Sequence, residues 1–148
     1  MKILLLADPI SSHTQKWANS LQDSGVQIAI FGLSRYDPNN YKRDIKIDIV
    51  DFSRSVKATR DGNILKSIYL TVIPKLKSLV RKYQPDIIHA HSASSYGFLG
   101  SLLDFHPFFI SLWGSDVYLF PKKSYFHRKL FKFSLTKADK TFPSAFSV

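Results

Sequence analysis

The sequence contains no cysteine, no glutamate and no long apolar run. Without cysteine, disulfides and cysteine-based zinc sites are excluded, and a cytoplasmic location is allowed but not proved. No apolar stretch approaches the roughly 20 residues that a membrane-spanning helix needs. The opening apolar run, residues 3–7, is too short for the core of a signal peptide, and Asp8 ends it. We therefore expect a chain without a disulfide, a signal peptide or a membrane span.

Positive charge, in contrast, is in excess. The 148 residues carry a formal net charge of +10, and all eleven acidic residues are aspartate. Residues 57–82 and residues 118–140 each hold seven Lys or Arg against a single Asp. Such patches attract polyanions, namely nucleic acid, anionic lipid head groups or phosphorylated substrates. The alternative is a solvated basic surface that only aids solubility.

Short apolar runs alternate with amphipathic segments along one domain-sized chain. The alternation predicts an α/β fold, with a Rossmann-like parallel sheet of about five or six strands and helices on both faces. Strands are predicted at residues 2–7, 26–31, 45–50, 86–91 and 108–113, with a sixth candidate at 141–143, and helices within residues 11–24, 63–83, 92–103 and 124–135.

Four local signals refine this outline. Residues 11–14 offer side chains that cap a helix, and Gly25 suits the left-handed turn that ends it. Residues 45–50 alternate apolar and polar side chains, which suits an edge strand. Pro74 is expected to kink the long helical segment or to start a second helix. Residues 114–116, Gly-Ser-Asp, are typical of a tight turn.

The predicted sheet also indicates where a ligand would bind. In open parallel α/β sheets, ligands bind beyond the carboxyl ends of the strands. This rule points to the segments that follow four of the predicted strands, residues 8–13, 31–34, 91–96 and 113–116. The pattern alone predicts a fold and an edge for the site, and no reaction.

Several segments resemble a known family. Residues 85–91, PDIIHAH, and residues 111–117, SLWGSDV, are similar to segments of family 4 glycosyltransferases. Residues 12–14, Ser-His-Thr, with Trp17 in the following helix, resemble members that act on bacterial surface polysaccharides, and residues 137–141 resemble the last part of their N-terminal domain. Over almost its whole length the chain is thus similar to the N-terminal, acceptor-side domain of a retaining glycosyltransferase of the GT-B fold.

The resemblance implies a second, C-terminal Rossmann-like domain that binds the nucleotide-sugar donor through a glutamate pair and basic residues. This sequence has no glutamate and ends at Val148. We therefore expect residues 1–148 to form a single N-terminal domain, with the donor-binding domain absent from the chain and supplied by a longer protein or a separate subunit. The expected reaction moves a sugar from the donor, as co-substrate, to a glycan or lipid-linked acceptor, with no other cofactor and no metal.

His89 and His91 lie two residues apart on a predicted strand, so both point to the same face. A metal site would need a third ligand, and a histidine packed at the end of a strand is the structural alternative. The resemblance places His91 near the reacting sugar as a catalytic residue. A neutral imidazole there would hydrogen-bond a sugar hydroxyl or stabilise the transition state.

The resemblance also assigns roles to residues 113–116, Trp-Gly-Ser-Asp. Asp116 is the second catalytic candidate, because it would bind an acceptor hydroxyl or hold the loop, while a cap or turn role is the structural alternative. Gly114 and Ser115 are expected to line the substrate site, since glycine lets the backbone approach a sugar or phosphate. Trp113 stands where many relatives carry histidine, and it would stack on a sugar ring or pack into the core.

Two further segments complete the predicted substrate site. Ser12 and His13 are expected to contact the acceptor or the donor, in a loop where many relatives have paired glycines. Ser94, Ser95 and Tyr96 open a helix whose N-terminus suits a phosphate or a hydroxyl, although ordinary capping explains these residues too.

The basic stretch of residues 118–132 is interleaved with aromatic side chains, which suits an interfacial membrane helix. It predicts a cytoplasmic protein held at the inner face of the membrane, where a lipid-linked acceptor would lie. Nucleic acid is the competing partner, and it is disfavoured because the sequence has no nucleic-acid-binding motif. The membrane-binding candidates are Lys122, Lys123, Phe126, Arg128 and Lys129.

Two other functions stay open at this point. A stand-alone Rossmann-like module for an anionic small ligand or a partner subunit predicts a stable, monodisperse domain. A basic nucleic-acid binder predicts an affinity that falls steeply with salt. The acceptor domain of a glycosyltransferase predicts instead an apolar edge that is left uncovered.

Overall fold

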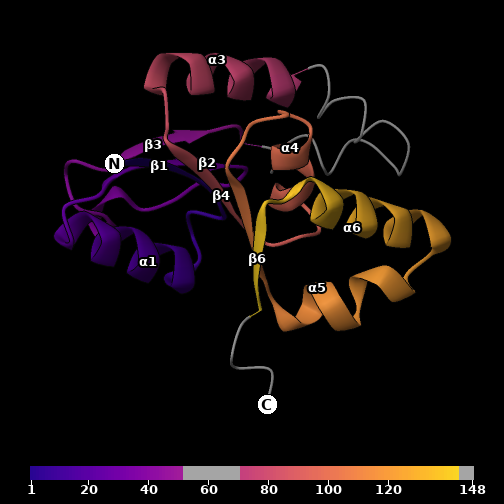
Figure 1. The fold of residues 1–148 in the computed structure, drawn as a ribbon. Helices are drawn as coiled ribbons and strands as arrows, with labels where there is room; N and C mark the ends of the chain where they lie inside the picture. Colours follow the sequence, from indigo (N-terminus) through magenta and orange to yellow (C-terminus); the bar gives the residue numbers. More distant parts are fainter. Residues whose placement is uncertain (52–70, 144–148) are drawn as a thin grey trace.

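The computed structural model describes residues 1–51 and 71–143 (Figure 1). None of the described helices is long and apolar enough to cross a bilayer, and the longest of them, α6, has 13 residues. The elements are β1 (Lys2–Leu6), α1 (Ser12–Asp23), β2 (Gln27–Gly32), η1 (Pro38–Asn40), β3 (Lys46–Ile49), α3 (Ile73–Tyr83), β4 (Ile87–His91), α4 (Tyr96–Ser101), β5 (Phe108–Leu112), α5 (Gly114–Tyr118), η3 (Phe120–Lys122), α6 (Tyr125–Lys137) and β6 (Lys140–Pro143).

The six described strands run parallel in one sheet with the order β3-β2-β1-β4-β5-β6. At its centre, Leu5 of β1 is in register with Ile30 of β2 on one side and with His89 of β4 on the other. This order confirms the Rossmann-like prediction, and β3 lies at an edge, as its alternating pattern indicates. Because the chain runs outward from β1 to β3 and then returns to β4, the loops after β1 and β4 meet at the carboxyl edge.

Hydrophobic clusters cover both faces of the sheet centre, as a parallel sheet requires. On one face, Leu4 and Leu6 belong to a buried cluster that includes Leu76 of α3 and Leu99 of α4. On the other face, the cluster that contains Leu5 includes Ala18 of α1. Figure 1 shows the same arrangement, with α1 on one side of the sheet and α3 and α4 on the other. The helices on both faces confirm the predicted layers.

One of the local helix signals is confirmed. Gly25 follows α1 with a φ of 87°, the left-handed conformation expected at the end of that helix. Pro74 lies in the first turn of α3, directly after the π-helical residues Thr71 and Val72, so it stands where the helical geometry changes. Val72 and Leu76 of the predicted apolar stripe are fully buried. The part of that predicted helix within residues 63–70 lies outside the described residues.

Two other local predictions are wrong. The side chain of Ser11, the residue before α1, makes no capping hydrogen bond, and its amide instead donates to the carbonyl of Asp8 at 3.1 Å. Residues 114–116 begin the short helix α5 instead of forming an isolated turn. The reason is that the amide of Val117 donates to the carbonyl of Trp113 at 3.3 Å, which closes a helical turn around these residues.

Close packing of α4 against the loop after β4 yields a stability test. A Cβ added to Gly97 would lie 2.6 Å from the carbonyl oxygen of Ser92, whereas a Cβ added to Gly114 would lie 4.0 Å from its nearest neighbour. We expect Gly97→Ala to lower the free energy of unfolding by about 1–3 kcal/mol, because backbone must shift to admit the methyl group. Gly114→Ala, at the first residue of α5, is the matched control and should unfold at the wild-type urea concentration or slightly above it, because alanine favours a helix more than glycine does. Equal midpoints for the two variants would contradict this packing.

Candidate functional site

A cavity of about 390 Å³ lies at the carboxyl edge of the sheet, where the loops after β1, β4 and β5 meet. This is the point at which the strand order reverses, the usual ligand site of doubly wound sheets. The cavity is lined by Asp8, Ser11, His13 and Thr14 from the β1–α1 segment, by His91, Ser92, Ser94, Ser95 and Tyr96 from the β4–α4 segment, and by Trp113 after β5.

Six of the predicted substrate-site or catalytic residues are therefore brought together. They are His13, His91, Ser94, Ser95, Tyr96 and Trp113. Ser12, the first residue of α1, is exposed and does not line the cavity, and neither does Gly114. The side chains of Ser115 and Asp116 lie outside the described part of the chain, so their predicted roles stay predictions.

Asp8, which the sequence analysis placed in an edge segment but not in the site, anchors one wall of the cavity. Its Oδ1 accepts hydrogen bonds from the Ser34 hydroxyl at 2.5 Å and from the Ile10 amide at 3.2 Å. The β1–α1 loop is thereby tied to the loop after β2. An aspartate at the end of a buried strand is the sequence signal that would have identified it.

Tyr96 ties the β4–α4 wall to the same neighbouring loop. Its hydroxyl oxygen accepts a hydrogen bond from the amide of Leu33 at 3.1 Å. Burial raises the pKa of the Tyr96 hydroxyl to about 12, against the smaller opposing effect of the Leu33 hydrogen bond, and the nearby charge of Asp8 adds to the rise. The phenol therefore stays protonated at neutral pH and serves the site as a hydrogen-bonding group.

Hydroxyl groups crowd the loop between β4 and α4. The Ser92 side chain lies 3.3 Å from the Ser95 hydroxyl and 3.5 Å from the Ser94 hydroxyl. Ser92 also has a φ of 154°, outside the usual range for a residue with a side chain. Its carbonyl accepts from the Gly97 amide at 2.8 Å, and this bond holds the turn. The loop thus lines the cavity with groups that both donate and accept hydrogen bonds.

His91 is the most unusual group in the cavity wall. Only 6% of the residue is exposed, and neither ring nitrogen has a hydrogen-bond partner within residues 1–51 and 71–143. Burial, with smaller contributions from the nearby His89 and His13, lowers the pKa of His91 to about 3. The imidazole is therefore neutral at pH 7, with one nitrogen able to donate and the other able to accept. A buried polar group without a hydrogen-bond partner lowers the stability of the fold, so these two nitrogens mark His91 as a candidate binding group.

Aromatic rings enclose this imidazole. The His91 ring lies edge-on to Trp17 of α1, with 5.5 Å between ring centroids, and to Trp113, with 6.2 Å. Trp113 in turn contacts His13, with centroids 5.0 Å apart. The Trp113 ring on the cavity wall thus contacts both His13, from the β1–α1 segment, and His91, from β4.

His89, on the same face as His91, has a structural role. Its Nε2 lies 2.8 Å from the hydroxyl of Ser111 on β5, which gives this buried ring a hydrogen-bond partner. Burial lowers the pKa of His89 to about 4. In the described residues no cluster of three or more His, Cys, Asp or Glu side chains is arranged to hold a metal ion. His89 therefore has its hydrogen-bond partner inside the sheet, whereas His91 faces the cavity.

The two histidines predict a loss of stability in mild acid. Their folded-state pKa values of about 4 and about 3 lie below the ordinary 6.5, so between these values the unfolded chain takes up protons that the folded chain does not. The contribution of each neutral histidine to the free energy of unfolding is complete above pH 6.5. It declines as the pH falls, by roughly 2 kcal/mol per histidine at about pH 5. Urea unfolding measured at about pH 7.5 and pH 5 tests this expectation.

His91→Asn should show a shallower pH dependence of the unfolding free energy than the wild type. His106→Asn is the matched control, because His106 is half exposed and the side-chain hydrogen bond with Asp139 raises its pKa. Its removal should not make the dependence shallower. Identical slopes for wild type and His91→Asn would show that His91 does not titrate as its burial implies.

Comparison with known proteins agrees with this architecture. Residues 2–144 match the family described as Glycosyl transferase 4-like. The UDP-GlcNAc 2-epimerase of Neisseria meningitidis, solved with UDP-GlcNAc, superposes with a TM-score of 0.60 at 14% identity, over 97% of this chain and 40% of that one. UGT73P12 of Glycyrrhiza uralensis, complexed with glycyrrhetinic acid 3-O-monoglucuronide, gives 0.58 at 16% identity, over 99% of this chain and 44% of that one.

A third structure is similar at a lower score. The enzyme WbmH of Bordetella bronchiseptica, in complex with NAD+, has a TM-score of 0.53 at 11% identity, over 97% of this chain and 55% of that one. The chain thus spans about half the length of the structures it matches, and identities this low establish the fold alone. No curated protein matches the sequence. The family match covers nearly every residue, and the chain belongs to the Glycosyl transferase 4-like family, with the fold of an N-terminal glycosyltransferase domain of the GT-B kind.

Proposed function

We propose that this domain holds the acceptor in a glycosyltransferase that moves a sugar from a nucleotide-sugar donor to a hydroxyl of a glycan or lipid-linked acceptor, in the synthesis of a bacterial surface polysaccharide. The observation that carries the proposal is the cavity at the strand-order reversal, with the buried imidazole of His91 in its wall. The family of the chain supports the class of reaction.

The chemistry of the cavity wall suits a sugar. The loop hydroxyls of Ser92, Ser94 and Ser95 offer donors and acceptors for sugar hydroxyls, and Trp113 offers a ring on which the C–H face of a sugar packs. The volume of about 390 Å³ lies within the range of small-molecule sites. The site therefore combines an apolar wall with several polar groups that fix the orientation of a ligand.

His91 acts in this proposal as a neutral hydrogen-bonding group. With a pKa of about 3 it carries no proton to give as an acid at neutral pH, but it donates or accepts one hydrogen bond without a net charge. Such a group stabilises charge that develops on the reacting sugar or orients the attacking hydroxyl. Asp116, three residues after Trp113, is proposed to bind an acceptor hydroxyl at the same edge.

A second domain is proposed to bind the nucleotide-sugar, with retention at the anomeric carbon and without a metal. Two observations favour this division of labour. The chain spans 40%, 44% and 55% of the three structures compared above. Ile10 and Trp17, both exposed, lie in the loop and helix beside the cavity, an apolar edge that a second domain would cover.

Sugar transfer by the complete gene product that carries this chain tests the proposal. The assay offers a panel of nucleotide-sugars with a membrane extract as the source of acceptor, and residues 1–148 are assayed beside it. We expect transfer by the complete protein and none by residues 1–148 alone. If the complete protein neither transfers a sugar nor binds a nucleotide-sugar, the alternative of a stand-alone binding module replaces this proposal.

A single substitution tests the role of His91. In the complete protein we expect His91→Asn to lower kcat/KM about 100-fold, the usual order for removing one group that stabilises the transition state. His106→Asn, at an exposed histidine outside the cavity, should retain wild-type kcat/KM. Urea unfolding of both variants separates lost chemistry from lost folding. A His91→Asn variant that folds and turns over normally would remove His91 from the reaction.

A further inference from the structure

Exposed apolar side chains gather on the segment that joins β5 to α6. Val117, Tyr118 and Leu119 at the end of α5 are all exposed, Leu119 by 63%. Tyr125 and Phe126, in the first turn of α6, are 70% and 52% exposed. Exposing this much apolar surface in water is unfavourable, so a contiguous group of such side chains marks an interaction surface.

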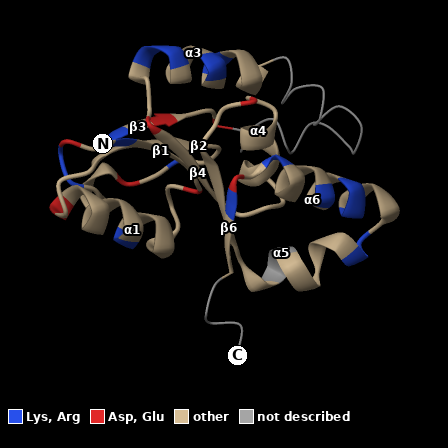
Figure 2. Ribbon diagram, in the orientation of Figure 1, with Lys and Arg blue, Asp and Glu red and all other residues tan. Residues whose placement is uncertain are grey.

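The same segment is strongly cationic. Residues 117–138 contain six Lys or Arg and no acidic residue. Figure 2 shows blue and no red along α6 and the turn before it. Lys129 lies over the ring of Tyr125, 4.8 Å from the ring centroid, and Lys123 lies 5.9 Å from the centroid of Phe120. Cations and exposed rings are therefore neighbours on one surface.

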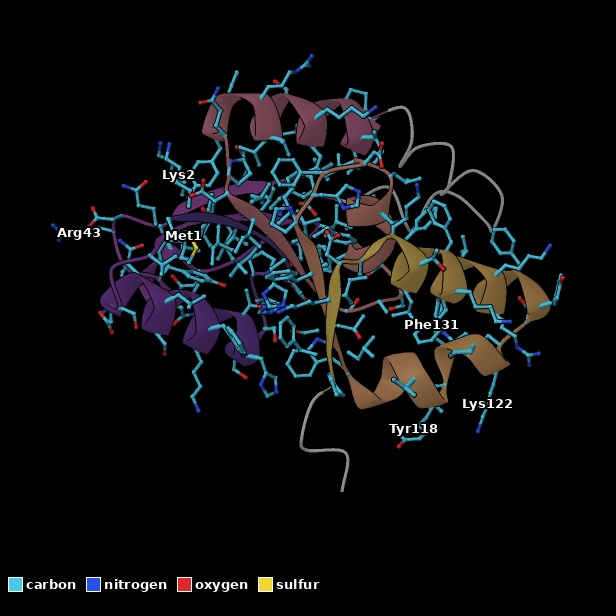
Figure 3. All side chains as sticks on the ribbon, in the orientation of Figure 1. Met1, Lys2, Arg43, Tyr118, Lys122 and Phe131 are labelled. Carbon is cyan, nitrogen blue, oxygen red and sulfur yellow. The ribbon has the colours of Figure 1, made fainter. Side chains whose placement is uncertain are left out.

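The short helix η3 joins residues 117–119, the apolar tip of this surface, to Lys122 and Lys123. It contacts both α5 and α6, and Phe120 of η3 stacks edge-on against His127 of α6, with centroids 4.9 Å apart. Figure 3 shows Tyr118 and Lys122 extending together from α5 and η3, away from α6. These contacts pack α5, η3 and the start of α6 against one another, so residues 117–119 and the two lysines belong to one unit.

We propose that this unit, residues 117–129, docks the protein on an anionic lipid bilayer. Val117, Tyr118 and Leu119 enter the interface between head groups and acyl chains, while Lys122 and Lys123 bind the head-group phosphates. The aliphatic tip favours a bilayer over a nucleic acid, because valine and leucine gain from a hydrocarbon environment and have no polar atom for a phosphate or a base. Charge complementarity names the lipid class, since the unit offers cations and no carboxylate.

The docking unit continues directly from the wall of the cavity. Trp113 lines the cavity, and its carbonyl accepts the Val117 amide that begins the tip. A bilayer bound at residues 117–119 would therefore lie beside the site. Delivery of a lipid-linked acceptor from that bilayer rests on the proposed function, whereas the docking itself does not.

Vesicle co-sedimentation of the complete protein tests the docking without any transfer assay. The vesicles contain phosphatidylcholine with or without about 30% phosphatidylglycerol. We expect binding to the anionic vesicles only. The double variant Lys122→Gln/Lys123→Gln should bind roughly 25-fold more weakly, because each cation near such a surface contributes about a fivefold factor. Leu119→Ser should bind about tenfold more weakly, because its apolar side chain no longer enters the interface.

A matched control decides the result. Lys77→Gln/Arg81→Gln removes two exposed charges from α3, outside the docking unit. This variant should bind like the wild type. Equal losses of binding in test and control variants, or equal binding to neutral and anionic vesicles, would overturn the proposal.

Tighter binding to duplex DNA than to anionic vesicles, unaffected by Leu119→Ser, would assign the surface to nucleic acid instead. Normal vesicle binding by a protein without transfer activity would leave the docking intact and reject only the transfer.

Discussion

The parallel pairing of β1 with β4 is the constraint on which the site depends. It joins residues 3–6 to residues 87–90, strands that are far apart in the sequence, and it places the loops that follow them side by side. Burial of Leu4 and Leu6 against Ile88 in one cluster stabilises the pairing. If these strands were not neighbours, Asp8 and His91 would not share a cavity.

On the face that α1 covers, the side chains of the sheet change from aliphatic on β2 and β1 to aromatic and polar on β4. Leu5 of β1 is in register with His89 of β4, so an imidazole continues a row that is aliphatic on β1 and β2. Ser111 satisfies His89, and the rings of Trp17 and Trp113 surround His91. The low polarity of this surrounding keeps both histidines neutral. The edge therefore favours hydrogen bonding and ring packing over proton transfer, and no Lys or Arg of the described residues lines the cavity.

The sequence by itself determined the order and type of nearly every described element. Strand and helix periodicity are local properties, and the carboxyl-edge rule then named the segments that hold His13, His91, Ser94 and Trp113. Local signals failed where one composition suits two local structures. Residues 114–116 have the composition of a turn, which a short helix shares, and the hydrogen bond from Val117 to the Trp113 carbonyl makes them the start of a helix.

The tertiary structure alone decided how the edge segments become a site. Asp8 is held by Ser34 across 26 positions, and the Tyr96 hydroxyl accepts from Leu33 across 63, so neither bond leaves a mark in local sequence. The state of His91 is likewise a tertiary property. Sequence spacing places it on a face. Its lowered pKa, and the lack of a hydrogen-bond partner for its nitrogens among the described residues, arise from burial among rings contributed by α1 and by the end of β5. Burial and long-range hydrogen bonds depend on the whole fold, which is why the sequence predicted where this site lies and the structure determined its chemistry.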